Sequence, residues 1–469
     1  MRSENAPTHA TRLPRTGVAA LAVFLVVACG DTTDPGPSEP VGTYNGGTLT
    51  PSSVNVNSAD VEVDAADYET VQLRLRTAGE PDEATPSYPI VDGHADLPVL
   101  GLLAGHDYSI DVLMTAGSAV DSVDTFSLST PPLPDWIPDI GLDGTPIDGF
   151  IGLAHPGGPI VVDGRGRVRW YVQSEDPILN NFTAHPTGEY TVYGTADGIR
   201  QFRVLDERGE VVRHIGCVER DTRFHDVRVL PGGDYWIMCD HPIPTDLSER
   251  GGEADGTVNW TTLQHVDADG TLLFEFDTSE HFSLDDIDPT AFEGTRELNI
   301  THGNAIALDT DGGILVSWRS LGEITKIDPV TGEVVWRLGG RANQFAITDP
   351  TRAFDRQHGL RVIGPGEIQF FDNGTEAPSR LVRYVIDEQE LTAEIELEYT
   401  DPSGAFTLIG GSTDLLPGGD ALVSYGPAGL VVGVDGAGER TFALTGLDGN
   451  YIFRAFYQPS LYASERRAQ

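Results

Sequence analysis

The stretch from Thr301 to Trp336 reads THGNAIALDTDGGILVSWRSLGEITKIDPVTGEVVW, and it indicates the fold more clearly than any other. After the opening Thr301-His302-Gly303-Asn304, short apolar runs follow at 313–317, 325–328 and 332–336, separated by turn residues such as Asp and Gly. Short apolar runs bounded by such residues are typical of β-strands joined by tight turns. The stretch therefore predicts one small antiparallel sheet.

Looser copies of this unit lie on both sides of it. They cover residues 157–171, 188–214, 224–276, 357–397 and 413–443. Each unit has about four short strands in roughly 40 to 50 residues, which is the period of a β-propeller blade. No long amphipathic helix separates the strands, which disfavours a parallel α/β fold. We therefore predict an all-β chain in which residues 135–463 form a six-bladed β-propeller, with the segment from Tyr451 to Tyr462 completing the first blade.

A second, smaller β-region precedes these repeats. Alternating apolar and polar residues occur in the runs 54–56, 60–63, 70–76, 108–114 and 122–128. Alternation with regularly spaced turns is typical of an antiparallel β-sandwich. We predict an immunoglobulin-like or fibronectin type III-like sandwich over residues 46–132, and the prolines at 131, 132 and 134 mark its end because proline cannot continue a strand ladder.

The N-terminus predicts a targeting signal. Arg12 and Arg15 precede an apolar run from Gly17 to Ala28, which is too short to cross a bilayer and suits a signal peptide over residues 1–28. The run ends in Val-Val-Ala-Cys29, which resembles the lipobox of bacterial lipoproteins, whose cysteine is lipidated; an ordinary secretory peptide is the alternative. The composition of residues 29–45 predicts a flexible linker. We expect an exported protein, anchored through Cys29 to a bacterial membrane and facing the periplasm or the cell exterior.

The charge of the chain excludes some functions. It has 30 Lys plus Arg against 72 Asp plus Glu, a formal net charge of -42. Nucleic acids attract basic surfaces, so a nucleic-acid partner is not expected. Lys326 is the single lysine, which nearly excludes lysine-based catalysis.

The remaining cysteines leave two states open. If Cys29 is lipidated, Cys217 and Cys239 are left, and in an exported protein they can form a disulfide. Two reduced thiols on neighbouring strands are the alternative.

Two other features stand apart from the repeat. The insert from Pro242 to Gly256 breaks the period, and we expect a surface loop there, with a lid as a further role. Residues 309–313 and 267–270 look like calcium loops, but neither continues to the glutamate of a full EF-hand loop. We therefore interpret both as hairpin turns.

Three of the repeats open with a histidine: His225, His302 and His358. In a propeller the innermost strands start at one central channel, so these side chains should converge. A single histidine is better explained by a surface or core position, but three at equivalent positions indicate a site. Asn304, two residues after His302, would share its strand face. Arg319, at the end of the next strand, suits bidentate binding of an oxyanion.

In their order and spacing these residues resemble the bacterial arylsulfate sulfotransferase family. The likeness extends roughly from Asp148 to Tyr462, and its motifs are His225-Asp226, His302-x-Asn304, Ser317-x-Arg319, Gly332 to Gly340, Gln357-His358, Phe371-Asp372-Asn373-Gly374 and Ser379-Arg380.

This resemblance implies a propeller behind a small β-domain, and a transferase with no nucleotide, metal or other cofactor. It implies ping-pong transfer of a sulfuryl group from an aryl sulfate to a phenol, with the group carried by the residue that matches His358 as a sulfohistidine. His225, His302, Asn304 and Arg319 would line the same site.

The chemistry of these residue types is compatible with that reaction. Sulfuryl transfer, like phosphoryl transfer, depends mostly on positioning and charge stabilisation. His358 must be neutral to attack, and a nearby Arg319 would lower its pKa and bind the sulfonate oxygens. Either His225 or His302 could act as general acid toward the leaving phenolate.

Two other functions remain open at this point. Three converging histidines could ligate zinc or another divalent ion, as in a metal-dependent propeller hydrolase or lyase, although Arg319 in the same shell would repel a cation. The propeller could also be a non-catalytic surface module that binds a glycan or a protein.

Overall fold

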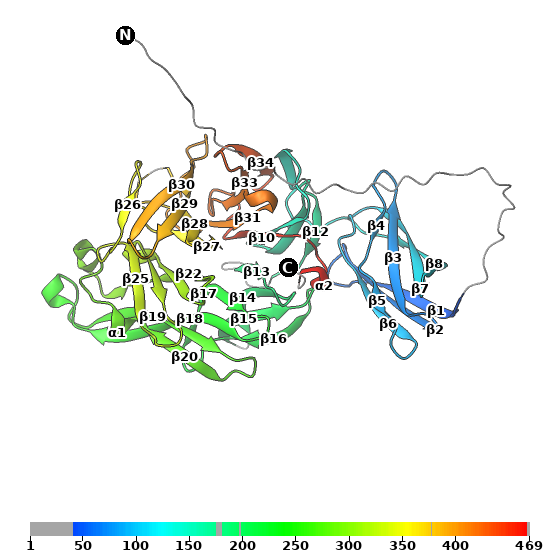
Figure 1. The fold of residues 1–469 in the computed structure, drawn as a ribbon, viewed down its shortest axis with the longest axis horizontal. Coiled ribbons are helices and arrows are strands. Elements are labelled where there is room, and N and C mark those ends of the chain that lie inside the picture. The colour runs from blue at the N-terminus through cyan, green and yellow to red at the C-terminus, as the bar shows by residue number, and fades with distance from the viewer. Residues whose placement is uncertain (1–40, 175–180, 197, 377, 467–469) are drawn as a thin grey trace, which may run out of the picture. The chain divides into compact units, whose positions relative to one another are not determined.

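The computed structural model describes residues 41–174, 181–196, 198–376 and 378–466. The predicted signal peptide, Cys29 and most of the predicted linker lie outside the described residues. From Val41 onward the chain is an all-β structure (Figure 1). The described helical segments are short: α1 (Thr278–His281), α2 (Ala463–Arg466), η1 (Ser248–Arg250), η2 (Pro289–Phe292), η3 (Arg319–Leu321) and η4 (Pro417–Gly419). None of them is long and apolar enough to span a membrane.

Two antiparallel sheets form the region before residue 130. In spatial order, the first contains β1 (Thr43–Pro51), β2 (Ala59–Ala66) and β6 (His94–Val99). The second contains β4 (Glu83–Ala84), β3 (Thr70–Thr77), β7 (Asp107–Ala116) and β8 (Ala119–Ser129), with β5 (Tyr88–Pro89) also paired to β3. Apolar side chains from both sheets, such as Val61 and Leu73, share one buried core.

The predicted strand at 54–56 is wrong, and β1 begins within the predicted linker. The hydroxyl of Ser52 accepts hydrogen bonds from the N–H groups of Val54 and Asn55, and the Asn55 side chain accepts one from Asn57 N–H. Such local side-chain bonds compete with a strand ladder and favour a turn.

The rest of the described chain pairs into six further sheets of four or five strands. The first sheet contains β12 (Val168–Tyr171), β11 (Gly158–Asp163), β10 (Phe150–His155) and β35 (Ala455–Gln458). The second contains β13 (Phe182–Ala184), β14 (Tyr190–Ala196), β15 (Ile199–Leu205) and β16 (Val211–Ile215). The third contains β17 (Asp221–Val229), β18 (Tyr235–Thr245), β19 (Gly256–Val266), β20 (Leu272–Asp277) and β21 (Glu297–Asn299). The fourth contains β22 (Gly303–Leu308), β23 (Ile314–Trp318), β24 (Glu323–Ile327) and β25 (Val334–Gly339). The fifth contains β26 (Ala346–Thr348), β30 (Thr392–Tyr399), β29 (Arg380–Asp387), β28 (Glu367–Asp372) and β27 (His358–Gly364). The sixth contains β31 (Ser412–Leu415), β32 (Ala421–Ser424), β33 (Val431–Val434), β34 (Arg440–Thr445) and β9 (Gly141–Gly144).

Both ends of this region are tied into sheets. The C-terminal strand β35 pairs with β10, as the sequence predicts for the segment 451–462, and β9 pairs with β34 of the last sheet. The edge strands β17, β22, β27, β31 and β35 contact one another in this order. The starts of successive sheets therefore lie side by side.

The insert from Pro242 to Gly256 differs from the predicted loop. β18 and β19 pair through to Thr245↔Gly256, so residues 242–245 extend a hairpin and the intervening segment carries η1. The extension forms because Ile243 and Leu247 pack against the core that contains Val258.

The two acidic segments are hairpin turns, as predicted. Asp309 N–H donates to Gly313 O, and Asp267 N–H donates to Thr271 O. The carboxylates at the first turn also form ion pairs with a lysine. Lys326 Nζ lies within 2.8 Å of carboxylate oxygens from Asp309, Asp311 and Glu388.

Candidate active site

The three predicted histidines lie on or beside the edge strands of three successive sheets, and each of these strands is bulged there. In β17, Thr222 pairs with Cys239 and Val227 with Ile237, so residues 223–226 bulge out opposite Met238. In β22 the extra residue is Asn304. In β27 the register shifts between His358 and Arg361.

The comparable pairings β10–β11, β13–β14 and β31–β32 keep their register. Bulges re-aim side chains and are frequent next to active sites. The irregular pairing therefore singles out the strands that carry the histidines.

Backbone strain accompanies the bulges. His302 and Arg356 have positive φ angles of 48° and 56°, which non-glycine residues rarely adopt. Gly359 also has a positive φ, and a Cβ there would lie 2.5 Å from Ser412 Cα, so β27 and β31 can approach closely only with glycine at this position.

The bulge also corrects the predicted relation between His302 and Asn304. β22 begins only at Gly303, and Asn304 is the bulged residue, so the alternation of a regular strand does not relate the two side chains. Arg319 follows the last residue of β23, and its N–H donates to His302 O at 3.1 Å. Backbone contact therefore joins Arg319 to His302.

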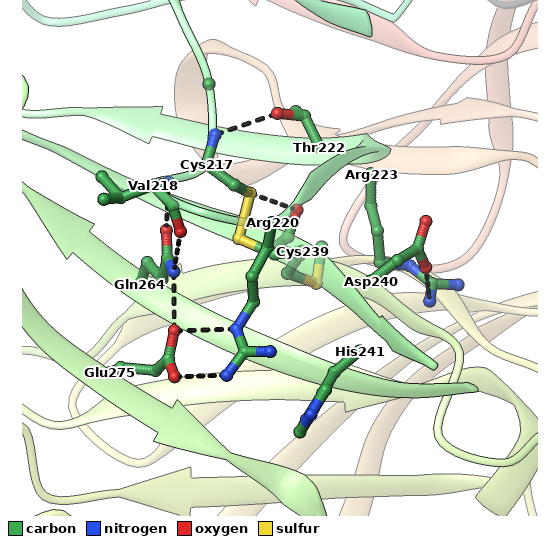
Figure 2. Close-up of a disulfide and its surroundings, with 12 residues drawn as sticks. Cys217, Val218, Arg220, Thr222, Arg223, Cys239, Asp240, His241, Gln264 and Glu275 are labelled. Carbon is green, nitrogen blue, oxygen red and sulfur yellow. Dashed lines mark hydrogen bonds and ion pairs between the residues drawn. A yellow bond between two sulfur atoms is a disulfide. The ribbon is translucent and has the colours of Figure 1, made fainter. Parts of the chain in front are cut away.

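A disulfide holds the start of the β17 bulge (Figure 2). It joins Cys217 to Cys239, and the sequence had left this state and the reduced thiols both open. Cys239 pairs with Thr222, the last regular residue before the bulge, and Cys217 N–H donates to the Thr222 hydroxyl. Just beyond, Arg223 pairs with Asp240 at 2.6 Å.

His225 and His302 form a directly bonded pair. Their Nε2 atoms are 3.1 Å apart, and Asn299 Nδ2 lies 3.1 Å from His302 Nδ1. At this distance one Nε2 carries a proton and the other a lone pair, so one imidazole donates to the other. The Phe224 ring stacks on His225, with ring centroids 3.9 Å apart.

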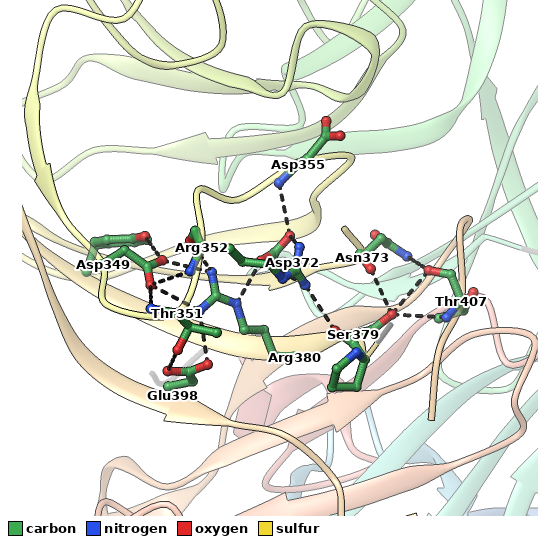
Figure 3. A network of polar contacts seen from close by, with 12 residues as sticks. Asp349, Thr351, Arg352, Asp355, Asp372, Asn373, Ser379, Arg380, Glu398 and Thr407 are labelled. Carbon is green, nitrogen blue, oxygen red and sulfur yellow. Dashed lines mark hydrogen bonds and ion pairs between the residues drawn. The ribbon is translucent and has the colours of Figure 1, made fainter. Parts of the chain in front are cut away.

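His358 has a defined tautomer. Its Nδ1 lies 2.9 Å from Arg356 O and 2.7 Å from Asn373 Oδ1. Asn373 Nδ2 donates to the carbonyls of Thr407 and Gly410, so the amide oxygen must face the imidazole (Figure 3 shows Asn373 and Thr407). Both neighbours of Nδ1 are acceptors, so Nδ1 carries the proton and Nε2 keeps its lone pair.

The surroundings keep the three imidazoles neutral. Burial lowers the pKa of His358 to about 4, and the charge of Arg319 acts in the same direction. Burial also holds the pKa values of His225 and His302 well below their usual range, and Arg223 lowers both further. A neutral imidazole with a lone pair is the form that acts as a nucleophile.

Two cavities meet at this group. The histidine cavity, of about 440 Å³, is lined by Tyr193, Arg223, Phe224, His225 and His302 among others. The arginine cavity, of about 530 Å³, is lined by Arg319, Arg341 and Arg356 among others. Asn299 lines both, so they adjoin at its side chain.

His358 and Asn304 line neither cavity. Both are almost fully buried, and Asn304 Nδ2 donates to the backbone carbonyl of Gln357 at 2.6 Å. Gly410 N–H contacts His358 Nε2 at 3.3 Å. The structure thus brings His225, His302 and Arg319 to the cavities and keeps the other two predicted residues behind their walls.

Several buried polar atoms of this group lack a partner among the described residues. They are Arg223 Nε, His225 Nδ1, Asn299 Oδ1, Asn304 Oδ1 and Arg319 Nε. Proteins satisfy the large majority of buried polar atoms, and each one left unpaired costs about 1–3 kcal/mol. Four of the five belong to residues that line the two cavities, and donors and acceptors without partners there indicate a polar ligand.

Sequence reasoning did not single out Arg223, Asn299, Arg356 or Asn373 as site residues. Asn373 has a sequence signal, because it stands in the Phe371-to-Gly374 motif. Arg356 and Arg223 each lie two residues before a predicted histidine, but spacing alone gives them no role. Asn299 carries no local signal, because its role depends on contact with His302.

Comparison with solved structures gives distant likenesses. A protein of unknown function from Bacteroides caccae matches at 12% identity, covering 66% of this chain and 98% of that chain, with a TM-score of 0.40. Virginiamycin B lyase from Staphylococcus aureus matches at 13% identity, with coverages of 65% and 88% and a TM-score of 0.36. TolB from Acinetobacter baumannii matches at 12% identity, with coverages of 75% and 80% and a TM-score of 0.39.

Sequence comparison is more informative about the family. No curated protein matches the chain. A family model, arylsulfotransferase (ASST), matches residues 210–446, a range that includes the three bulged strands and all five predicted catalytic residues. The chain therefore belongs to the arylsulfotransferase (ASST) family.

Proposed function

We propose that this protein is a nucleotide-independent aryl sulfate sulfotransferase that moves a sulfuryl group from an aryl sulfate to a phenolic acceptor. The route is ping-pong, through a sulfohistidine at His358. Family membership supports aryl sulfotransferase activity. The observation that carries the finer mechanism is the tautomer of His358, whose Nδ1–H is held by Asn373 and Arg356 and whose Nε2 lone pair meets only a backbone N–H at 3.3 Å.

His358 Nε2 accepts from Gly410 N–H and lines neither cavity, so the first half-reaction requires the Gly410 segment to move aside. His358 Nε2 then attacks sulfur and the bond from sulfur to the aryl oxygen breaks. The electron pair of that bond leaves with the phenolate. Arg319, which forms no ion pair in the described part of the chain and whose charge acts on His358, supplies positive charge for the sulfonate oxygens. The ring becomes cationic when Nε2 is sulfurylated, and its Nδ1–H is then stabilised by the acceptors Asn373 Oδ1 and Arg356 O.

In the second half-reaction a phenol oxygen attacks sulfur and His358 leaves as a neutral imidazole. The neutral pair of His225 and His302 is the candidate acceptor for the phenol proton, through His225 Nδ1, which has no partner among the described residues. The proton taken up there is returned to the phenolate that leaves in the next first half-reaction. Asn299 Oδ1, which has no partner among the described residues and belongs to a cavity wall, suits a phenol hydroxyl. Tyr193 and Phe224 give the histidine cavity an aromatic wall for an aryl ring.

The geometry favours this reading over a three-histidine metal site. A metal would need one free lone pair from each imidazole. The nitrogens of His225, His302 and His358 are not gathered within 4.8 Å of one another in the described structure, and the charges of Arg223 and Arg319 lie beside them.

The finer description of the fold and location is part of the same proposal. Six sheets with adjoining edge strands, closed by β35, support a six-bladed propeller over residues 135–463. The strand orders β1-β2-β6 and β4-β3-β7-β8, and a hydrogen bond from Leu103 N–H to Tyr108 Oη, support a fibronectin type III-like sandwich over 46–132. The disulfide is compatible with export and with a lipid anchor at Cys29.

Intact-mass spectrometry tests the proposal. Brief mixing with phenyl sulfate should add the mass of one sulfuryl group and release phenol, and a second phenol should then remove the adduct. The variant His358→Asn should form no adduct while unfolding at the same denaturant concentration as the parent. Absence of an adduct on the parent, or equal turnover by His358→Asn, contradicts the sulfohistidine route.

A further inference from the structure

The arginine cavity holds more positive charge than transfer of one sulfuryl group requires. Of the arginines that the structure describes, those without an ion pair are Arg200, Arg203, Arg319, Arg341, Arg356 and Arg466. Three of these line this one cavity. In a chain of net charge -42, such a concentration of unpaired cations indicates binding of an anion.

The three guanidinium groups lie at different depths. Arg319 and Arg356 are half-buried, whereas Arg341 is exposed at the rim. Arg341 donates from Nε to Asp285 O at 3.1 Å, a bond that positions the side chain and leaves both terminal nitrogens without a partner in the described structure. Arginine presents such nitrogens as a fork that matches a carboxylate.

The acidic residues of the cavity do not cancel this charge. Asp286 pairs with Arg337 at 3.1 Å, and Asp288 accepts the N–H of Thr290 at the start of η2. Burial raises the pKa of Asp355, whereas the charges of Arg356 and Arg319 act in the opposite direction. Three guanidinium groups without an ion pair therefore face two carboxylates, those of Asp288 and Asp355, and the cavity keeps a positive surplus.

The cavity also has room for an aryl ring between its ends. Its inner end meets the histidine cavity at Asn299, and its walls include the apolar side chains of Ile287, Ala291, Leu298 and Leu321. A phenol whose oxygen lies near Arg319 can therefore extend along an apolar wall toward Arg341.

We propose that the arginine cavity binds an aryl substrate that carries a second anionic group of the carboxylate class, with that group at Arg341 and Arg356. This inference rests on the proposed sulfuryl transfer and names the class of one of its two aryl partners. The sulfuryl end of the reaction uses Arg319, and the two additional arginines select the substituent on the far side of the ring.

A matched pair of substrates tests this selection. The acceptors are 4-hydroxybenzoate and 4-hydroxybenzamide, which differ in charge and little in shape, and the donors are their sulfate esters. We expect the parent to favour the carboxylate over the carboxamide by about tenfold in kcat/KM in at least one half-reaction, the scale of one charge-assisted contact near the surface. The variant Arg341→Gln should bring that ratio close to one, and added salt should reduce it in the parent.

Comparing the same two compounds between proteins cancels their different intrinsic reactivities. The matched control is Arg296→Gln, which removes an exposed arginine that pairs with Asp255 and does not line the cavity; it should keep the parental ratio. No preference in either half-reaction, or a preference that survives in Arg341→Gln, overturns the inference.

Direct binding separates this inference from the proposed reaction. Calorimetric titration of the parent and of Arg341→Gln with 4-hydroxybenzoate needs no turnover. Binding that depends on Arg341 without any sulfuryl transfer would support the anion cavity and contradict the transferase. Transfer with no dependence on Arg341 in binding or in kcat/KM would support the transferase and contradict the anion cavity.

Discussion

Arg380 and Arg319 are both withdrawn from solvent, but their surroundings differ in how completely they are paired. Arg380 is 1% exposed and bonds to Asp349, Asp372 and Glu398, each within 3.0 Å, and also to Arg352 O (Figure 3). Among the described residues the Arg319 guanidinium group donates only to Leu408 O, and its Nε has no partner.

A buried charge that is fully paired stabilises a particular structure, whereas one left open keeps its binding capacity for a ligand. The comparison teaches that the arginines most important for this fold and those most important for its chemistry are separated by pairing as well as by burial.

Asn373 connects the two regions. It directly follows Asp372, its carbonyl accepts from the Ser379 hydroxyl, and its side chain fixes His358. The paired network therefore serves as the scaffold of the unpaired site.

The largest expected effect on stability comes from Arg380→Met. It leaves Asp349 without its cation and Asp372 with only Arg352 at 3.3 Å, so we expect a loss of about 3–5 kcal/mol in the free energy of unfolding, measured with denaturant. Arg296→Met, which breaks an exposed pair with Asp255, should cost at most about 1 kcal/mol. Equal losses for both variants would remove the distinction between paired and open arginines.

Arg319→Met should lower activity and leave stability nearly unchanged, in contrast to Arg380→Met. Removing a charge that stabilises the transition state should lower kcat/KM for aryl sulfates by about 10²–10³-fold. Stability should stay within about 0.5 kcal/mol of the parent, or rise, because no ion pair is lost and one uncompensated charge no longer has to leave water. An unfolding loss as large as that of Arg380→Met would show that Arg319 is structural.

Substitution of Asn373 should have a smaller effect on the rate, and a second substitution at the same position serves as its control. Asn373→Leu removes the acceptor that keeps the proton on His358 Nδ1, and we expect sulfuryl-adduct formation to slow by about tenfold to a hundredfold. Asn373→Asp keeps an acceptor there and should recover much of the rate. Comparable rates for both variants would mean that the tautomer is set elsewhere.

The smallest expected effect is a shift in the pH dependence of kcat/KM. His358 is neutral above its pKa of about 4, so kcat/KM for the donor should be flat near neutrality and fall as pH drops toward that value. Without the charge of Arg319 the pKa rises toward its usual range, so Arg319→Met should move the acid limb to higher pH by up to about one unit. A limb that stays in place, or moves to lower pH, contradicts this electrostatic coupling.

The same pKa values set the pH dependence of stability. In the folded state His225, His302 and His358 have pKa values below the unfolded value of about 6.5. The unfolded chain therefore binds more protons between about pH 4 and pH 6.5, so stability should fall as pH falls through that window and stay level above it.

Much of the fold could be predicted from the sequence because strands and tight turns depend on neighbouring residues. The unit from Thr301 to Trp336, the turn at Asp309 and the closing segment near β35 all carry local signals, and the structure has strands or turns at each. The hairpin extension at 242–245 and the turn at 54–56 were missed, because distant packing and side-chain bonds decided them.

Some features of the candidate site could likewise be predicted from the sequence, and others could not. The sequence by itself determined the residue types at His225, His302 and His358 and their place at the start of three repeats. Only the tertiary structure decided the bulges, the tautomer that Asn373 imposes, and which arginines remain without a carboxylate. These features depend on hydrogen bonds and charges between residues far apart in the chain, and register and pairing of that kind leave no periodic trace in the sequence.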